Sequence, residues 1–185
     1  MSSILVLGFI VYLLMTAPVP AKEADVSQEA PIVPQEEVLT ENPVSVKDFS
    51  LADFQNTLND VELKMVAQHP IQAAQVYRAA SKAEEMTRRF YGYNGWQDSA
   101  DAYKHCLWNA LMKKYIGEAA AMEWANAHEY YSEGMDKEMD LFNNEVGRSI
   151  DVETRTEEQI INYVRELVST GQCLRIADGR LERTC

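Results

Sequence analysis

The sequence predicts an all-α protein: a compact helical bundle of about six helices, followed by a small C-terminal β-hairpin. Three observations support this fold class. Apolar residues recur at helical spacing in successive segments of the chain, and proline, glycine and Asn-Gly breaks separate these segments. Near the C-terminus, Asp178-Gly179 lies between two short apolar segments, which is typical of a two-residue hairpin turn. At 185 residues the chain can form one domain with a substantial core.

Composition divides the chain into three parts. Residues 4–15 form an apolar run, shorter than the roughly 20 residues that span a membrane, and small residues up to Ala21 follow it. We expect residues 1–21 to be a signal peptide or an N-terminal membrane anchor. Residues 22–46 are rich in proline and acidic side chains, which predicts a disordered tether. The helical domain, residues 47–185, is therefore expected to be periplasmic or secreted.

The first two predicted helices meet at a proline. Ser50 is the expected N-cap of the first, which ends at His69 because the residue before a proline avoids the helical conformation. Pro70 opens the second helix, where its missing N–H costs nothing, and this helix extends to about Phe90. The loop 91–96 then contains two glycines and an Asn-Gly pair.

Three helices are predicted in the central part of the chain. The third helix begins at Asp98 or Ser99 and continues to about residue 115. Gly117 separates it from an alanine-rich helix over residues 118–129. A fifth helix follows from about residue 135 to Arg148.

The C-terminal part is expected to hold one further helix and the hairpin. Thr156 and Gln159 have the spacing of a capping box, and Gly171 is the expected end of this helix. In the predicted hairpin register Cys173 faces Thr184, one residue from Cys185. We therefore expect a Cys173–Cys185 disulfide in an oxidising compartment, with the third cysteine, Cys106, a buried free thiol.

The charge balance excludes one class of partner. With a formal net charge of −12 and no stripe of basic residues, the chain is not expected to bind nucleic acid through phosphate contacts. The pairs Lys113-Lys114 and Arg88-Arg89 are isolated and are interpreted as solvated faces.

Polar residues at helical spacing in the central helices predict a site. Asp101, His105 and Asn109 are four residues apart and therefore share one side of the third helix. The fourth helix ends with His128-Glu129. The fifth places further polar residues on one face, where two adjacent asparagines disfavour the helix without an evident local gain. These are Asp140, Asn143, Asn144 and Gly147, with Arg148 beside them.

The chemistry of this cluster leaves several alternatives. A divalent metal held by His105, His128 and Asp140 is one. Glu129 and Asp140 as an acid/base pair, as in glycoside cleavage, is a second. A third has His128 as a general base oriented by Asp140, with an oxyanion stabilised by Arg148 and the asparagine amides. We assign catalytic roles to His105, His128, Glu129, Asp140 and Arg148, and substrate binding to Trp96, Asn109, Asn143 and Asn144.

Several motifs of the chain resemble a bacterial domain of unknown function. The similar segments are residues 93–105, 108–110, 127–129 and 139–148, and the Asp-Gly hairpin is also similar. That domain occurs in secreted and surface proteins and at the C-terminus of toxin-like chains. The resemblance implies an exported helical domain with a polar site at His105, Asn109, His128, Glu129, Asp140, Asn143, Asn144 and Arg148. The family often has a basic residue where Lys104 stands, whereas Phe142 replaces a histidine expected before the asparagine pair.

Two functions remain open from the sequence. The first is an exported hydrolase that acts on cell-envelope material or lipid, with or without a divalent metal. The second is a non-catalytic envelope or interaction protein whose polar cluster is a structural or ligand-binding network. An enzyme should keep part of the cluster open to a cleft, whereas a structural network should be closed and internally paired.

Overall fold

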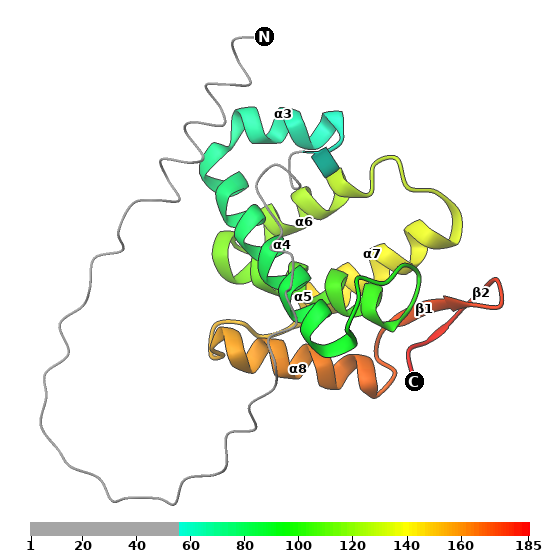
Figure 1. The fold of residues 1–185 in the computed structure, drawn as a ribbon. Coiled ribbons are helices and arrows are strands. Elements are labelled where there is room, and N and C mark those ends of the chain that lie inside the picture. The colour runs from blue at the N-terminus through cyan, green and yellow to red at the C-terminus, as the bar shows by residue number, and fades with distance from the viewer. Residues whose placement is uncertain (1–55) are drawn as a thin grey trace, which may run out of the picture.

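The computed structural model describes residues 56–185, which form a helical bundle with a two-stranded hairpin at one end (Figure 1). The predicted fold class is confirmed. The signal or anchor segment, the tether and the expected N-cap Ser50 lie outside the described residues. Within residues 56–185, none of the helices combines the length and the apolar character needed to cross a bilayer. The elements are α3 (Asp60–Gln68), α4 (Pro70–Tyr91), α5 (Ser99–Ile116), α6 (Glu118–His128), α7 (Gly134–Ser149), α8 (Glu157–Ser169), β1 (Leu174–Ala177) and β2 (Arg180–Arg183).

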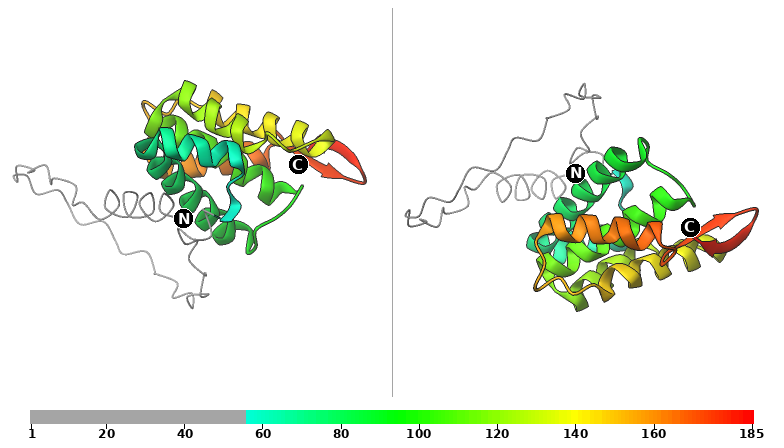
Figure 2. Two further views of the ribbon diagram at one scale, coloured as in Figure 1. Left: turned by 90° about the horizontal axis from the view of Figure 1, so that it is seen from above. Right: turned by 90° about the horizontal axis from the view of Figure 1, so that it is seen from below.

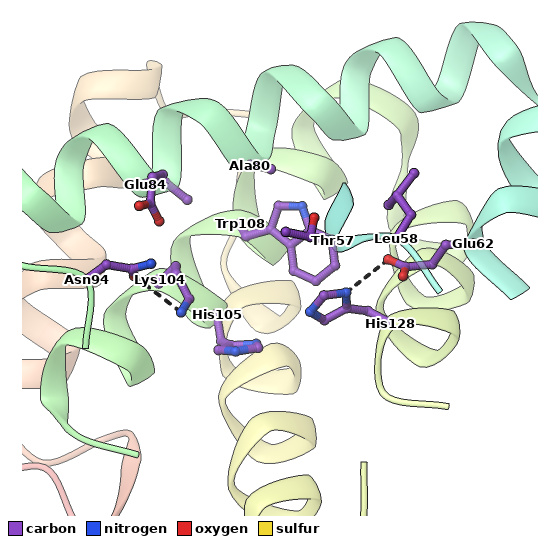
Figure 3. A pocket seen from close by; sticks show the side chains of 11 residues that line it. Thr57, Leu58, Glu62, Ala80, Glu84, Asn94, Lys104, His105, Trp108 and His128 are labelled. Atoms are coloured by element: carbon purple, nitrogen blue, oxygen red, sulfur yellow. Dashed lines mark hydrogen bonds and ion pairs between the residues drawn. The ribbon is translucent and has the colours of Figure 1, made fainter. Parts of the chain in front are cut away.

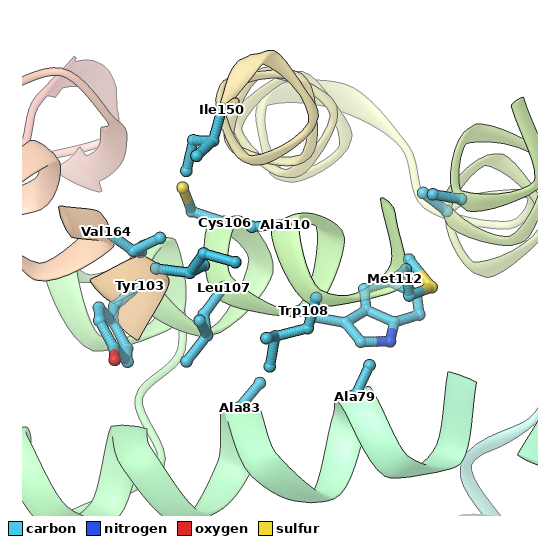
Figure 4. Close-up of a cluster of buried hydrophobic side chains, with 14 of the residues drawn as sticks. Ala79, Ala83, Tyr103, Cys106, Leu107, Trp108, Ala110, Met112, Ile150 and Val164 are labelled. Carbon is cyan, nitrogen blue, oxygen red and sulfur yellow. The ribbon is translucent and has the colours of Figure 1, made fainter. Parts of the chain in front are cut away.

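Helix α5 is the centre of the bundle. It packs against α4, α6, α7 and α8, and Figure 2 shows these helices around it from two sides. Every residue of α5 from Ala100 to Met112 except Lys104 is buried. A helix covered on all sides has no solvated face, so its polar residues must find partners inside the protein. Figure 4 shows the apolar part of this core, with Leu107, Trp108 and Met112 among side chains of the neighbouring helices.

The predicted helix starts are confirmed where they are described. Asp98 is the N-cap of α5, and its Oδ1 accepts hydrogen bonds from the backbone N–H groups of Ala100 (2.9 Å) and Asp101 (3.0 Å). Thr156 and Gln159 form the expected capping box of α8. Pro70 occupies the first turn of α4, as predicted.

The first predicted helix is interrupted. Residues 58 and 59 are not helical, and helix α3 begins after Asn59, which is its N-cap. The side-chain oxygen of Asn59 accepts from the N–H groups of Val61 and Glu62, and its Nδ2 donates to the carbonyl of Ala127 at 2.7 Å. The amide thus caps α3 and also docks it on the end of α6. That tertiary contact explains the break.

The hairpin has the predicted register, but the disulfide prediction was wrong. Ala177 faces Arg180, and Thr184 donates its N–H to the carbonyl of Cys173 at 3.1 Å. Cys173 is buried, whereas Cys185 is exposed, and both thiols are free. Successive residues of a strand point to opposite faces, so the one-residue offset turns the two sulfur atoms apart. Cys106 is a buried free thiol, as expected.

The lysine pair Lys113-Lys114 was wrongly interpreted as a solvated face. Lys113 Nζ donates to the carbonyl of Arg148 at 2.7 Å, in the last turn of α7. Lys114 Nζ donates to the carbonyls of Val152 (3.0 Å) and Arg155 (2.8 Å). The two ammonium groups therefore satisfy backbone carbonyls at the end of α7 and in the loop to α8.

Close packing of α5 on α7 depends on Gly147. A Cβ atom at this position would collide with the carbonyl oxygen of Cys106 and would lie 3.0 Å from Cβ of Asn109. Backbone atoms cannot rotate away as a flexible side chain can. The glycine therefore sets the helix separation at which the polar residues of α5 and α7 reach one another.

Substitution Gly147→Ala is expected to destabilise the protein by about 2 kcal/mol, because overpacking outweighs the roughly 1 kcal/mol that alanine gains in a helix interior. The measurement is the free energy of unfolding from urea titration. Glu145→Ala is the control, since Glu145 is exposed on the same helix; we expect a change within about 0.5 kcal/mol. A Gly147→Ala variant as stable as the wild type would show that α5 and α7 can separate freely.

Candidate functional site

A histidine and two aspartates from α5 and α7 form a buried cluster. Nε2 of His105 lies 3.6 Å from Oδ1 of Asp101 and 3.5 Å from Oδ1 of Asp140. One ligand atom from each residue can be chosen so that all three lie within 4.8 Å of one another. The three side chains are at most 9% exposed. The predicted alignment holds, because Asp101, His105 and Asn109 lie one turn apart on α5, and all three are buried.

A chain of hydrogen bonds determines which nitrogen of His105 carries the proton. Arg148 can only donate, and its Nη1 contacts Oδ1 of Asn109 at 2.6 Å. Nδ2 of Asn109 therefore faces Oδ1 of Asn144, to which it donates at 2.6 Å. That same oxygen lies 3.2 Å from Nδ1 of His105. Because Asn144 presents an acceptor, the proton is on Nδ1, and Nε2 directs its lone pair toward the two aspartates.

Two carboxylate oxygens in this region are buried without a hydrogen-bond partner. They are Oδ1 of Asp140 and Oε1 of Glu129, the second of which lies 3.8 Å from Nδ1 of His105. The other Glu129 oxygen accepts from Ser132 Oγ at 2.7 Å. Burial, followed by the charges of Glu129 and Asp101, raises the pKa of Asp140 to about 8. Burial also lowers the pKa of His105 to about 4, which keeps its imidazole neutral.

The second histidine of the site has a different carboxylate partner from the one considered in the sequence. Nδ1 of His128 lies 2.9 Å from Oε1 of Glu62, and the other Glu62 oxygen accepts from the N–H of Asn59 at 2.9 Å. Glu62 is buried, whereas the side chain of His128 is 38% exposed. Burial alone would lower the pKa of His128, but the hydrogen bond and charge of Glu62 outweigh it, so this pKa is raised.

Glu62 was missed by the sequence analysis. It lies on α3, distant in sequence from His128 at the end of α6, and the docking of Asn59 on α6 brings them together. The spacing of Asn59 and Glu62 is that of a capping box, a signal that identifies the helix start. That signal does not predict the contact with a histidine.

Both histidines line one pocket, which encloses about 200 Å³ between α3, α4, α5 and α6 (Figure 3). Their ring centroids are 6.2 Å apart, and the ring of Trp108 lies 5.2 Å from that of His128. Nε1 of Trp108 is buried without a hydrogen-bond partner. The remaining lining residues include apolar and polar side chains: Thr57, Leu58, Glu62, Ala80, Ala83, Glu84, Asn94 and Lys104.

Other residues predicted for the site have different surroundings. Asn143 forms two hydrogen bonds with the backbone of Leu174, so its side chain attaches β1 to α7. Trp96 is 72% exposed and is not among the residues that line the pocket. Arg148 reaches the site only through Asn109. Phe142 lies under the guanidinium of Arg183, with 5.0 Å between that group and the ring centroid, so a histidine here would face away from the cluster.

The fold and site define a class of protein: an all-α domain with a buried imidazole–carboxylate cluster beside a partly apolar pocket. The chain belongs to the DUF6973 family, a domain of unknown function, whose model matches residues 63–172. Every residue of the cluster and of the hydrogen-bond chain lies within the matched segment, and Glu62 immediately precedes it. Comparisons with the curated proteins and with the solved structures found no match. Export and toxin association remain predictions from the sequence.

Proposed function

We propose that this chain is an extracytoplasmic hydrolase that cleaves an ester bond in cell-envelope material or lipid, with His128 as its general base. The observation that carries this proposal is the Glu62–His128 pair at the wall of a pocket that His105 also lines. A buried carboxylate that orients a partly exposed histidine is the arrangement by which hydrolases activate water or a hydroxyl nucleophile.

The proton positions suit this role. Glu62 is an acceptor, so Nδ1 of neutral His128 carries the proton and Nε2 is left as a base. In the proposed reaction Nε2 takes a proton from water, and the hydroxide attacks the ester carbonyl carbon. When the C–O bond of the tetrahedral intermediate breaks, the imidazolium returns the proton to the alcohol that leaves. The negative charge of Glu62 stabilises the imidazolium during this cycle.

The pocket walls favour an ester with an apolar part. Leu58, Ala80, Ala83 and Trp108 supply apolar surface, whereas Lys104 and Asn94 are polar groups of the lining. A pocket of about 200 Å³ is smaller than the roughly 300–1,000 Å³ of drug-sized sites, so it would hold only the part of a substrate next to the scissile bond.

The non-catalytic alternative has one observation in its favour. The side chains from Arg148 to His105 are joined in an internally paired chain, as in a network that fixes helix docking. His128 is outside that chain and faces the pocket. The two functions therefore predict different effects of replacing His128 on hydrolytic activity.

The hydrolase proposal predicts that His128→Gln lowers kcat/KM by about 10²- to 10⁴-fold, the range for loss of a general base. The substrates are p-nitrophenyl esters of increasing acyl length and phospholipid vesicles, tested with the full-length chain. Glu62→Gln removes the charge that raises the pKa of His128, so the acidic limb of the pH–rate profile should move to lower pH. The direction follows because the base is active only above its own pKa.

His69→Gln is the matched control, since His69 is an exposed histidine outside the site. We expect its kcat/KM to equal that of the wild type. If His128→Gln hydrolyses the esters as fast as the wild type, or if the wild type cleaves none of them, the protein is not a hydrolase of this class. Thermal melts of each variant separate loss of function from loss of fold.

A further inference from the structure

We propose that Asp101, His105 and Asp140 form a binding site for one divalent transition-metal ion, with Zn²⁺ and Mn²⁺ the best candidates. This inference replaces His128, the third ligand expected from the sequence, by Asp101. It rests on the geometry of the cluster and does not depend on the hydrolase proposal.

The separations within the cluster suit a metal. A cation bonded at about 2.0–2.2 Å to nitrogen and carboxylate oxygen places neighbouring ligand atoms roughly 3.0–3.5 Å apart. Nε2 of His105 is 3.5 Å from Oδ1 of Asp140 and 3.6 Å from Oδ1 of Asp101. Small inward rotations of the two carboxylates would therefore complete a three-ligand site. Such a site keeps further coordination positions open for water or another ligand.

The hydrogen-bond chain prepares the histidine for coordination. A metal-binding imidazole must present an unprotonated nitrogen, and its other nitrogen usually donates to a fixed acceptor. Arg148, Asn109 and Asn144 provide that arrangement, because they place the proton on Nδ1 of His105. This arrangement explains why Asn109 and Asn144 are buried in helices although asparagine is unfavourable there.

A second, independent observation points to a missing positive partner. Oδ1 of Asp140 is directed at the cluster and has no hydrogen bond, although the residue is only 6% exposed. Its neighbour, Nε2 of His105, presents a lone pair and not an N–H. When Asp140 is ionised, this lone pair faces an unpaired buried carboxylate oxygen, an unfavourable contact that a cation between the two atoms removes.

Lys104 supplies the only positive charge that contacts these carboxylates among the described residues. Its Nζ lies 2.8 Å from Oδ1 of Asp101, the oxygen that also faces His105. The Lys104 side chain is 26% exposed, so it can turn toward solvent when a cation binds. Lys104 is therefore a competitor of the metal and not a ligand.

The donor set selects the type of ion. Imidazole favours the transition metals over Mg²⁺ and Ca²⁺, and two carboxylates suit Mn²⁺ as well as Zn²⁺. No thiolate is present in the cluster to select a softer ion. Mg²⁺ and Ca²⁺ are therefore expected to bind much more weakly.

The test is metal binding by the full-length chain after dialysis against chelator. Titration with Zn²⁺ and with Mn²⁺, followed by calorimetry and elemental analysis, should give one ion per chain. Asp140→Asn and Asp101→Asn should each weaken binding by at least about 100-fold, above the 10- to 100-fold typical of outer-shell partners. Lys104→Met should strengthen it, a change that a purely structural role of the cluster does not predict. Glu138→Gln is the control, because Glu138 is an exposed carboxylate on the same helix as Asp140.

A measurement on the wild type keeps the inference testable if the aspartate variants fail to fold. On addition of Zn²⁺, the ¹⁵N resonance of His105 Nε2 should shift while Nδ1 keeps its proton. Absence of binding, binding unaffected in Asp140→Asn, or coordination through Nδ1 would each overturn the site. Because no substrate is used, tight metal binding without ester hydrolysis would remove the proposed function and leave this inference standing.

Discussion

In Asn109→Asp, the imidazole of His105 is expected to change tautomer. The new carboxylate keeps the contact with Arg148 but can no longer donate to Oδ1 of Asn144. The side-chain amide of Asn144 should then flip, so that its Nδ2 donates to the new carboxylate and to Nδ1 of His105. Nδ1 of His105 becomes an acceptor, the proton moves to Nε2, and the lone pair that faced the aspartates is lost. Cation affinity should fall by about 100-fold or more, since the ligand atom itself is blocked.

Asn144→Asp is the matched variant. It adds the same negative charge at the next residue of the hydrogen-bond chain, between Asn109 and His105. Its carboxylate still accepts from Asn109 and from Nδ1 of His105, and the amide nitrogen that it removes had no partner. The ¹⁵N shifts of the two ring nitrogens report the tautomer directly. If His105 keeps its proton on Nδ1 in Asn109→Asp, the hydrogen-bond chain does not control the imidazole.

Asn143→Asp is expected to release the C-terminal hairpin from α7 and to lower the free energy of unfolding by about 3 kcal/mol. In the wild type, Nδ2 of Asn143 donates to the carbonyl of Leu174 at 2.9 Å, and its Oδ1 accepts from the N–H of the same residue at 2.8 Å. The carboxylate retains the second bond but opposes the Leu174 carbonyl with a charged oxygen. Residue 143 is buried, so water cannot offset the repulsion.

Urea unfolding gives the loss of stability, and hydrogen exchange of residues 174–183 shows whether the hairpin opens first. Glu182→Gln serves as the control, because it removes an ion pair with Arg175 on the exposed surface of the hairpin. Exposed pairs contribute little, so a change of less than about 1 kcal/mol is expected. Equal hydrogen exchange in Asn143→Asp and in the wild type would assign Asn143 another role.

The sequence predicts which polar residues share a face within each single helix. Asp101, His105 and Asn109 share a face of α5 because residues four apart in a helix always do. Asp140 and Asn144 share a face of α7 for the same reason. The structure shows that all five of these side chains are buried.

The contacts between helices could not be predicted in this way. His128 pairs with Glu62 because Asn59 docks α3 on α6, and nothing in the local spacing of either residue encodes that meeting. The same limit explains Cys173 and Cys185, whose side chains diverge although the hairpin register was correct. It also explains Lys113 and Lys114, because their carbonyl partners belong to α7 and the following loop.

The sequence by itself determined the helices from α4 onward, the caps of α5 and α8, the hairpin turn and the polar face of each central helix, because these depend on residues a few positions apart. Only the tertiary structure decided which imidazole meets which carboxylate, since that depends on helix separation and docking. Gly147 allows α5 and α7 to approach until His105 lies between two aspartates. The candidate metal site is therefore a product of packing between helices.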